Sequence, residues 1–175
     1  MSGSYKWAAN SVDFMYMNDI IKGNNTKNPK LFGPGAKMTR AMLVTVLYRA
    51  AGEPTVTGIT NKFTDNKQGQ YYYNAVLWAV EQGITTGLNA TTFGPDVTVT
   101  RGQVATFLYR AASAAKPSTF NPFTDVKTTA YNYDAILWAY DNRITTGTSD
   151  TTFSPDAYCT RAQIVTFLYR YYQGR

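Results

Sequence analysis

The sequence predicts a mainly α-helical protein made of three helix–loop–helix repeats, with short irregular or extended connectors, packed together as one module. Two observations lead to this fold class. One segment recurs three times at nearly constant spacing, and each copy contains two stretches with the apolar periodicity of helices. Because a unit of this size cannot bury its apolar face alone, the three copies must pack against one another.

The repeats are clearest at a Thr-Arg dipeptide, which occurs as Thr39-Arg40, Thr100-Arg101 and Thr160-Arg161. We therefore divide the chain into repeat 1 (residues 1–51), repeat 2 (52–112) and repeat 3 (113–175). Each of these arginines follows a phenylalanine by eight residues: Phe32, Phe93 and Phe153. Repeats 2 and 3 open with Phe-Thr-Asp, which contributes Asp65 and Asp125, whereas repeat 1 lacks this opening.

The first helix of each repeat is expected at about residues 7–18, 71–82 and 131–142. The cores NAVLWAV and DAILWAY are apolar nearly all round, which is typical of helices covered on several sides. Trp78 and Trp138 lie inside these stretches. This position favours a place in the core over a platform on which a sugar ring stacks, and both alternatives stay open.

The second helix is expected to begin just after each Thr of the Thr-Arg dipeptide. Thr100 with Gln103, and Thr160 with Gln163, have the spacing of capping boxes, in which the Thr and Gln side chains each bond a backbone N–H of the first turn. Thr39 can cap its helix, but Met42 cannot complete a box. Apolar residues at i, i+3, i+4 and i+7 follow in all three copies.

A cation occupies the first helical position in every repeat: Arg40, Arg101 and Arg161. A positive charge there opposes the helix dipole by roughly 0.3–1 kcal/mol. One interpretation is that the arginine and the free N–H groups of the helix start receive a carboxylate or phosphate. The alternative is an internal ion pair with an acid, either Asp96 or Asp156, which lie five residues before Arg101 and Arg161, or the opening acids Asp65 and Asp125. Arg40 is favoured as a ligand contact, because Gly35 stands five residues before it, where the other repeats have Asp96 and Asp156.

The net charge of +6 is concentrated in repeat 1, where seven basic residues face two acidic ones. Its basic stretch suits an anionic partner, or is a solvated loop; it contains Lys22, Lys27, Lys30, Lys37 and Arg40. The stretch is not interleaved with aromatic residues, so nucleic acid is not the expected partner.

Several classes of function are excluded by residues that the sequence lacks. With no His and one Cys among 175 residues, zinc sites, internal disulfides and Ser-His-Asp catalysis are excluded. We therefore expect no catalytic residues, no metal, no cofactor and no enzyme activity. No apolar run reaches the length of a membrane span. No signal-peptide core follows Met1, so we expect either an intracellular chain or a piece of an exported protein.

These motifs together resemble the S-layer homology domain, present as three tandem copies. The resemblance rests on the Phe-Thr-Asp openings, the Trp-Ala and Ile-Thr-Thr-Gly segments, the loop ending Phe-Gly/Ser-Pro-Asp, and the Thr-Arg helix. It implies a pseudo-threefold bundle with the second helices at its centre and ligand grooves between adjacent repeats. The Glu of the family's Thr-Arg-Ala-Glu motif is replaced here by Met42, Gln103 and Gln163.

The resemblance also implies attachment to the secondary polysaccharide of bacterial cell walls, often through a negatively charged pyruvyl ketal, and thus a place at the cell surface. The residues that it assigns to ligand binding are Arg40, Arg101, Arg161, Gly23, Gly87, Gly147, Asp65 and Asp125. Trp78, Trp138 and Lys37 are added as candidate sugar and anion contacts. The alternative function is a freestanding binder of a small anionic ligand, such as a nucleotide-like signal, in the same grooves.

Overall fold

The computed structural model describes residues 3–23, 31–117 and 120–174. In these residues the chain forms a 3₁₀ helix and six α-helices: η1 (Gly3–Ala8), α1 (Ala9–Met17), α2 (Arg40–Ala50), α3 (Tyr73–Glu81), α4 (Arg101–Ala111), α5 (Tyr133–Asp141) and α6 (Arg161–Gln173). The described ranges contain isolated β-bridges but no named strand. The predicted mainly α fold class is therefore confirmed.

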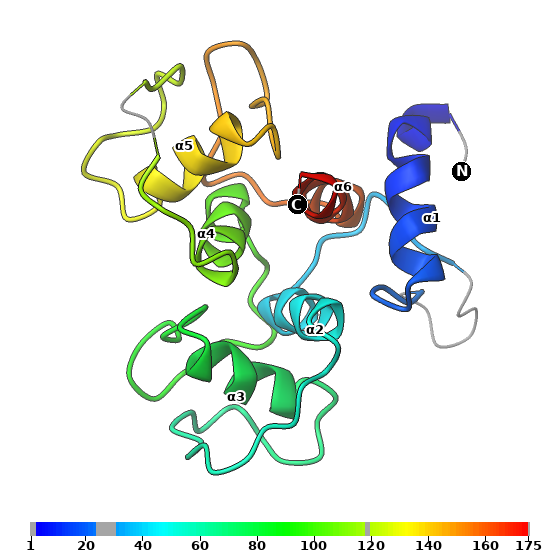
Figure 1. Cartoon of the computed structure of the whole chain (residues 1–175), viewed down its shortest axis with the longest axis vertical. Helices are drawn as coiled ribbons and strands as arrows, with labels where there is room; N and C mark the ends of the chain where they lie inside the picture. Colours follow the sequence, from blue (N-terminus) through cyan, green and yellow to red (C-terminus); the bar gives the residue numbers. More distant parts are fainter. Residues whose placement is uncertain (1–2, 24–30, 118–119, 175) are drawn as a thin grey trace.

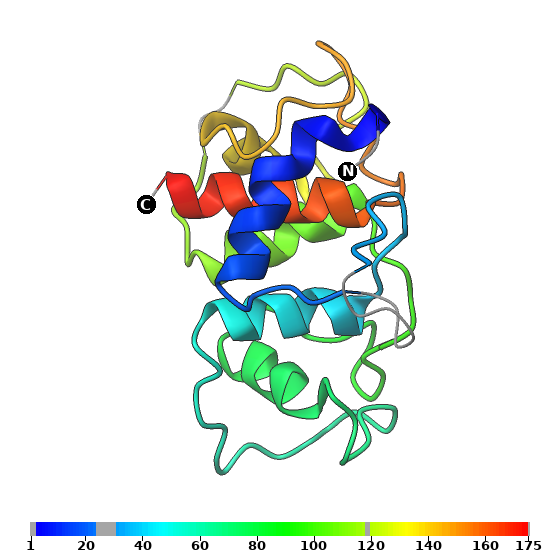
Figure 2. The ribbon, with the colours of Figure 1, turned by 90° about the vertical axis from the view of Figure 1, so that its right-hand side faces the viewer.

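The helices form three lobes around a centre (Figure 1). The second helices α2, α4 and α6 lie inside, and α3, α5 and α1 lie outside them. The packed pairs are α2 with α3, α4 with α5, and α6 with α1, and Figure 2 shows α1 lying across α6. Each lobe thus joins the second helix of one repeat to the first helix of the next, and the last repeat closes onto the first. The boundaries of the repeats in the sequence remain a prediction.

Three antiparallel bridges tie the repeats together just before the second helices: Lys37 with Thr160, Thr39 with Thr98, and Thr100 with Tyr158. The Val99 N–H donates to the Met38 carbonyl at 3.0 Å, and the Cys159 N–H donates to the Val99 carbonyl at 3.2 Å. Because these residues immediately precede α2, α4 and α6, the bridges place the N-termini of the three central helices side by side.

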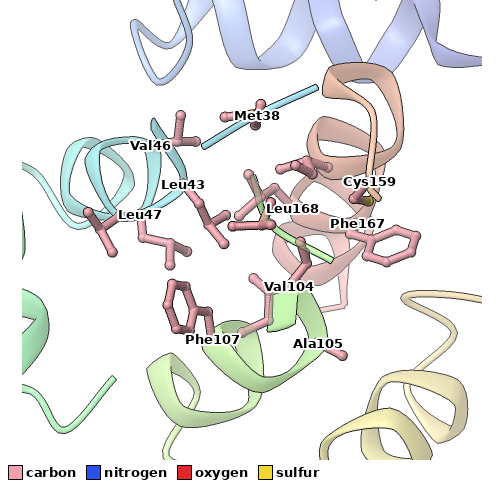
Figure 3. Close-up of a cluster of buried hydrophobic side chains, with 14 of the residues drawn as sticks. Met38, Leu43, Val46, Leu47, Val104, Ala105, Phe107, Cys159, Phe167 and Leu168 are labelled. Atoms are coloured by element: carbon pink, nitrogen blue, oxygen red, sulfur yellow. The ribbon is translucent and has the colours of Figure 1, made fainter. Parts of the chain in front are cut away.

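The core lies where α2, α4 and α6 face one another (Figure 3). Leu43, Val104 and Leu168 point toward this centre, and each is fully buried. Burying each such side chain contributes roughly 1.5–3 kcal/mol. Cys159 is also fully buried in this cluster, and burial raises the pKa of its thiol to about 12.

The helix starts follow the sequence. Thr100 accepts a hydrogen bond from the Gln103 N–H at 3.4 Å, while Gln103 Oε1 accepts one from the Thr100 N–H at 3.3 Å. Thr160 and Gln163 repeat the arrangement, so both predicted capping boxes are confirmed. Thr39 caps α2 through the Met42 N–H. Of the helices in the described part of the chain, none has the length and apolar character needed to cross a bilayer.

Candidate ligand-binding grooves

The three cap arginines, Arg40, Arg101 and Arg161, are buried and reach into the following repeat. Their exposed fractions are only 3%, 3% and 4%. Each Nε donates to the carbonyl of a phenylalanine in that repeat's loop: Arg40 to Phe93 at 2.8 Å, Arg101 to Phe153 at 2.9 Å, and Arg161 to Phe32 at 2.9 Å. The cap arginines therefore link the lobes in cyclic order.

The backbone N–H groups at the starts of the central helices are already bonded. In α4, the first two N–H groups donate to the carbonyls of Ala157 and Pro155, both at 2.9 Å, and the third donates to the Thr100 side chain. The starts of α2 and α6 are satisfied in the same way. The sequence-based expectation that free N–H groups here receive an anion is therefore wrong, because loops from the next repeat occupy them.

The predicted groove glycines lie beside the cap arginines. Arg40 Nη2 approaches the Thr85 hydroxyl at 3.4 Å, and the same hydroxyl accepts the Gly87 N–H at 3.1 Å. Arg101, Thr145 and Gly147 repeat this arrangement. In the third groove, Arg161 Nη2 donates instead to the Lys22 carbonyl at 2.8 Å, next to Gly23.

The opening acids act on the loop that the cap arginines also contact. The two carboxylate oxygens of Asp65 accept the N–H groups of Phe93 and Gly94 at 2.8 and 2.7 Å. Asp125 binds Phe153 and Ser154 with the same distances. Between residues that are both described, the ion pair within 4.0 Å joins Arg49 and Glu53, and it includes no cap arginine. The alternative of a direct pair between a cap arginine and an acid is thus wrong for this part of the chain.

Burial leaves the cap arginines as desolvated cations. Desolvation lowers the pKa of Arg40 and of Arg101, and the nearby carboxylates of Asp65 and Asp125 partly oppose this effect. Burial lowers the pKa of Arg161 to about 10. No carboxylate of the described residues offsets that burial, in contrast to Asp65 at Arg40 and Asp125 at Arg101. A buried guanidinium without a carboxylate in contact is a favourable environment for an anionic ligand.

A cavity of about 220 Å³ opens beside Arg101. It is lined by Trp7, Arg101, Thr145, Thr146, Gly147, Gln163, Thr166, Phe167 and Arg170. An adjoining cavity of about 640 Å³ shares three of these residues, Thr145, Thr146 and Arg170. Arg170 Nη1 donates to the Ile144 carbonyl at 3.3 Å, which holds the loop of repeat 3 against α6. We call this region the Arg101 groove.

Trp7 supplies the aromatic wall of the Arg101 groove. It is 55% exposed, and its indole N–H donates to the Ser4 carbonyl at 3.0 Å. Tyr71 and Tyr131 occupy the same position in the other lobes, one residue before the N-caps of α3 and α5. Sequence reasoning did not select Trp7. The signal was present, because each of these aromatic residues lies seven positions before the Phe14, Trp78 or Trp138 position.

The structure brings only some of the predicted site residues to a groove. Arg101 and Gly147 line the cavity, and Asp125 lies behind it on the Phe153 backbone. Trp78 and Trp138 are 8% exposed and pack against Tyr48 and Tyr109, with ring centroids 5.6 and 5.7 Å apart. These tryptophans lie in the core.

The predicted basic stretch is only partly described. Lys37 is exposed, with its Nζ 4.1 Å from the centroid of the Tyr158 ring. Lys22 is also exposed, whereas Arg40 is buried. Lys27 and Lys30 lie outside the described residues. Lys37 and Lys22 are the lysines of this stretch that the structure places at the surface.

Comparison with known proteins gives a consistent family. A model of the S-layer homology domain matches residues 1–41, 62–105 and 122–165. An endoglucanase of Bacillus sp. (strain KSM-635) is 31% identical over 139 residues, which cover 75% of this chain and 15% of that protein. A surface-layer 125 kDa protein of Lysinibacillus sphaericus is 32% identical over 135 residues, covering 77% of this chain and 11% of that protein.

A third relative covers more of the chain at lower identity. The S-layer protein sap of Bacillus anthracis is 23% identical over 165 residues, which cover 93% of this chain and 20% of that protein. The chain thus spans between 11% and 20% of the lengths of these three relatives. The shared segment occurs in proteins whose names differ, as expected of a module.

Proposed function

The chain belongs to the S-layer homology domain family, and we propose that it is a binding module that anchors a protein non-covalently to an anionic polysaccharide of the bacterial cell wall. Its similarity to segments of a surface-layer protein, an S-layer protein and an endoglucanase supports a module that attaches different proteins to one surface. The proposed location is the cell surface, and no catalytic step is assigned to the module.

The observation that carries this proposal is the buried Arg101 guanidinium beside an open cavity. Nε and Nη2 of Arg101 are hydrogen-bonded to the protein, while the residue also lines the cavity. We assign the remaining guanidinium donors to a carboxylate of the ligand, such as that of a pyruvyl ketal. An ionised acceptor strengthens such hydrogen bonds, and the buried site strengthens them further.

The other residues of the Arg101 groove suit the sugar that carries this carboxylate. The Thr146 hydroxyl and the Gln163 amide nitrogen can bond ring hydroxyls. The exposed indole of Trp7 offers a flat apolar face for a pyranose ring. These groups come from repeats 1, 2 and 3, so the ligand site requires the closed ring of lobes.

The three grooves differ in ways that affect this proposal. The rings of Phe153 and Phe167 lie 4.8 and 5.3 Å from the Arg101 guanidinium carbon, and Arg40 has two equivalent aromatic neighbours. Arg161 has Phe32 at 4.8 Å, but Val46 stands at the Phe167 position and Ile21 at the Thr145 position. We therefore propose the Arg40 and Arg101 grooves as the principal anion sites.

Sedimentation with purified cell-wall sacculi tests the function. The wild-type protein is expected to sediment with the sacculi, and less so after mild acid has removed their pyruvyl ketals. Trp7→Ala should weaken binding about three- to tenfold, because a stacking contact is lost. Tyr16→Ala is the matched control, since Tyr16 is also 55% exposed and lies in the same lobe.

Two results would contradict the proposal. If the wild-type protein stays in the supernatant, it does not bind the wall. If a thermal shift then reveals a nucleotide-like ligand, the freestanding small-molecule binder is the better function. If Trp7→Ala and Tyr16→Ala bind sacculi as the wild type does, the Arg101 groove is not the wall-binding site.

A further inference from the structure

A pocket of about 480 Å³ lies between the C-terminal half of α2 and the start of α3. It is lined by Thr45, Tyr48, Arg49, Glu53, Gln68, Gly69, Gln70, Tyr71, Tyr73 and Asn74. We call it the tyrosine pocket. None of these residues belongs to the Arg101 groove, so the pocket is a separate feature of the α2–α3 lobe.

The tyrosine pocket is nevertheless continuous with a groove position. Thr45 and Arg49 lie five and nine residues after Arg40, as Thr166 and Arg170 do after Arg161, and Tyr71 is the counterpart of Trp7. The counterparts Thr166, Arg170 and Trp7 all line the Arg101 groove. The tyrosine pocket therefore begins along the wall of the equivalent groove, which is that of Arg161. It extends from there toward Tyr48 and Glu53, at the C-terminal end of α2.

The charge of the tyrosine pocket differs from that of the Arg101 groove. Its two charged residues, Arg49 and Glu53, pair with each other at 3.5 Å. In the described part of the chain, the pocket thus has no cation without a partner, whereas Arg101 contacts no carboxylate. Because Arg49 and Glu53 neutralise each other, the tyrosine pocket offers no unpaired positive charge to an anionic ligand. The pocket therefore favours a neutral polar molecule over an anion.

The walls of the pocket combine aromatic rings with amides. Tyr48 is fixed in place, since its hydroxyl donates to the Pro54 carbonyl at 2.8 Å and its ring packs on Trp78. Tyr71 is 61% exposed. The exposed amides of Gln68, Gln70 and Asn74 each offer two donors and one acceptor oxygen. Flat rings beside paired donors and acceptors match the apolar faces and hydroxyl edges of a pyranose.

The corresponding pocket of the next lobe lacks this set of amides. Its volume is about 280 Å³. Thr128, Ala130 and Asp134 stand where the tyrosine pocket has Gln68, Gln70 and Asn74, while Tyr131 and Tyr133 are retained. The three amides are therefore not shared by the α4–α5 lobe, whose smaller pocket is an internal control.

We propose that the tyrosine pocket binds a neutral pyranose residue of the wall glycan, beside the Arg161 groove and apart from the Arg40 and Arg101 grooves that we propose as the principal anion sites. The identity of the glycan rests on the function proposed above; the preference for a neutral sugar rests on the tyrosine pocket itself. Tyr71 and Tyr73 contact the ring face, and Gln70 and Asn74 bond its hydroxyl or N-acetyl groups. The module thus recognises a charged and an uncharged sugar unit through different residues.

NMR titration of the ¹⁵N-labelled protein tests this proposal. The probe is a set of oligosaccharides from the wall polysaccharide, freed of their acidic groups by mild acid. Saturable shifts are expected for the side-chain amides of Gln70 and Asn74. Gln70→Ala, followed at Asn74, should raise the Kd about three- to tenfold, because the hydrogen bonds of one amide are lost. Asp134→Ala, in the smaller pocket, should leave the Kd unchanged.

The outcomes separate this proposal from the proposed function. If the amides of the tyrosine pocket do not shift at saturating probe, or if Gln70→Ala binds with the wild-type Kd, the sugar pocket is overturned even when the native glycan binds. If the neutral probe binds as expected but the protein does not sediment with sacculi, the sugar pocket stands and wall anchoring fails. Circular dichroism of Gln70→Ala should match the wild type, because Gln70 is exposed.

Discussion

Arg40 and Asp65 bind the same residue, Phe93, from its two sides. The Arg40 guanidinium donates to the Phe93 carbonyl at 2.8 Å, and the Asp65 carboxylate accepts the Phe93 N–H at 2.8 Å. A cation from repeat 1 and an anion from repeat 2 are thereby coupled through one backbone residue without touching. In the same way, Arg101 donates to the Phe153 carbonyl and Asp125 accepts the Phe153 N–H.

This arrangement predicts that the opening acids stabilise the fold. Asp65→Asn replaces one acceptor oxygen by an NH₂ group and removes the charge, so both charge-assisted bonds to the loop weaken. The free energy of unfolding should fall by about 1–3 kcal/mol, measured by urea denaturation. Asp96→Asn is the control, because Asp96 is exposed and should change stability by less than about 0.5 kcal/mol. Equal effects of the two substitutions would contradict the structural role of Asp65.

The groove glycine Gly87 should tolerate no side chain. Its φ is +92°, and an added Cβ would come within 3.0 Å of the Phe63 ring and of the Asn89 carbonyl oxygen. Gly87→Ala is therefore expected to destabilise the protein by more than about 2 kcal/mol, through backbone strain and a clash. Thermal unfolding followed by circular dichroism measures the effect.

Gly52→Ala separates strain from clash. Gly52 also has a positive φ, +82°, but nothing lies within 4 Å of its added Cβ. Its substitution should cost only about 1 kcal/mol, the price of an alanine in the left-handed region. If Gly52→Ala is as damaging as Gly87→Ala, contact with Phe63 is not the reason for glycine at position 87.

The sequence was sufficient for the helices but not for the way in which the cap arginines are satisfied. Helix starts depend on local patterns such as Thr100 with Gln103, and these were confirmed. Arg40 meets Phe93 across 53 residues, and Asp65 meets it across 28. Neither spacing produces a local periodicity. From the sequence, a cap arginine was expected either to pair with an internal acid or to be free for a ligand. Neither alternative included its actual partner, the carbonyl of a loop phenylalanine.

Trp7 was missed for a different reason. It precedes a first helix whose other copies carry Tyr71 and Tyr131 in register, so its place was visible from the repeats. The stacking role that we propose for Trp7 depends on its exposure beside α6, and η1 and α1 pack on α6 only because the last repeat closes onto the first. Trp78 and Trp138 recur in a clearer sequence motif and were therefore named as candidate sugar contacts, yet both pack in the core.

The buried thiol of Cys159 is expected to lower the free energy of unfolding as the pH rises through the alkaline range. Burial raises the pKa of its thiol from 9.0 to about 12. Between these values the unfolded chain loses the thiol proton and the folded protein keeps it, so the unfolded state binds fewer protons and stability falls as pH rises. The slope from this group is at most about 1.4 kcal/mol per pH unit.

Comparison with Cys159→Ala isolates the contribution of the thiol. From pH 8 to 10.5, urea denaturation should show a steeper loss of stability for the wild type than for the variant. Other alkaline groups, including the tyrosines, titrate in both proteins and cancel in the difference. Identical pH profiles would show that the folded thiol titrates like an exposed one, which contradicts its burial.

Arg143 identifies a position where the native residue is strained. Its φ is +57°, and the corresponding residue of repeat 2 is Gly83, with a φ of +67°. Since a residue with a Cβ is disfavoured in this left-handed region, Arg143→Gly should raise the free energy of unfolding by about 1 kcal/mol. Gly83→Arg should lower it by a similar amount, because no atom lies within 4 Å of the added Cβ and only the backbone preference changes. Urea denaturation of both variants checks this, and a loss of stability in Arg143→Gly would mean that contacts of the arginine side chain outweigh the strain of its backbone.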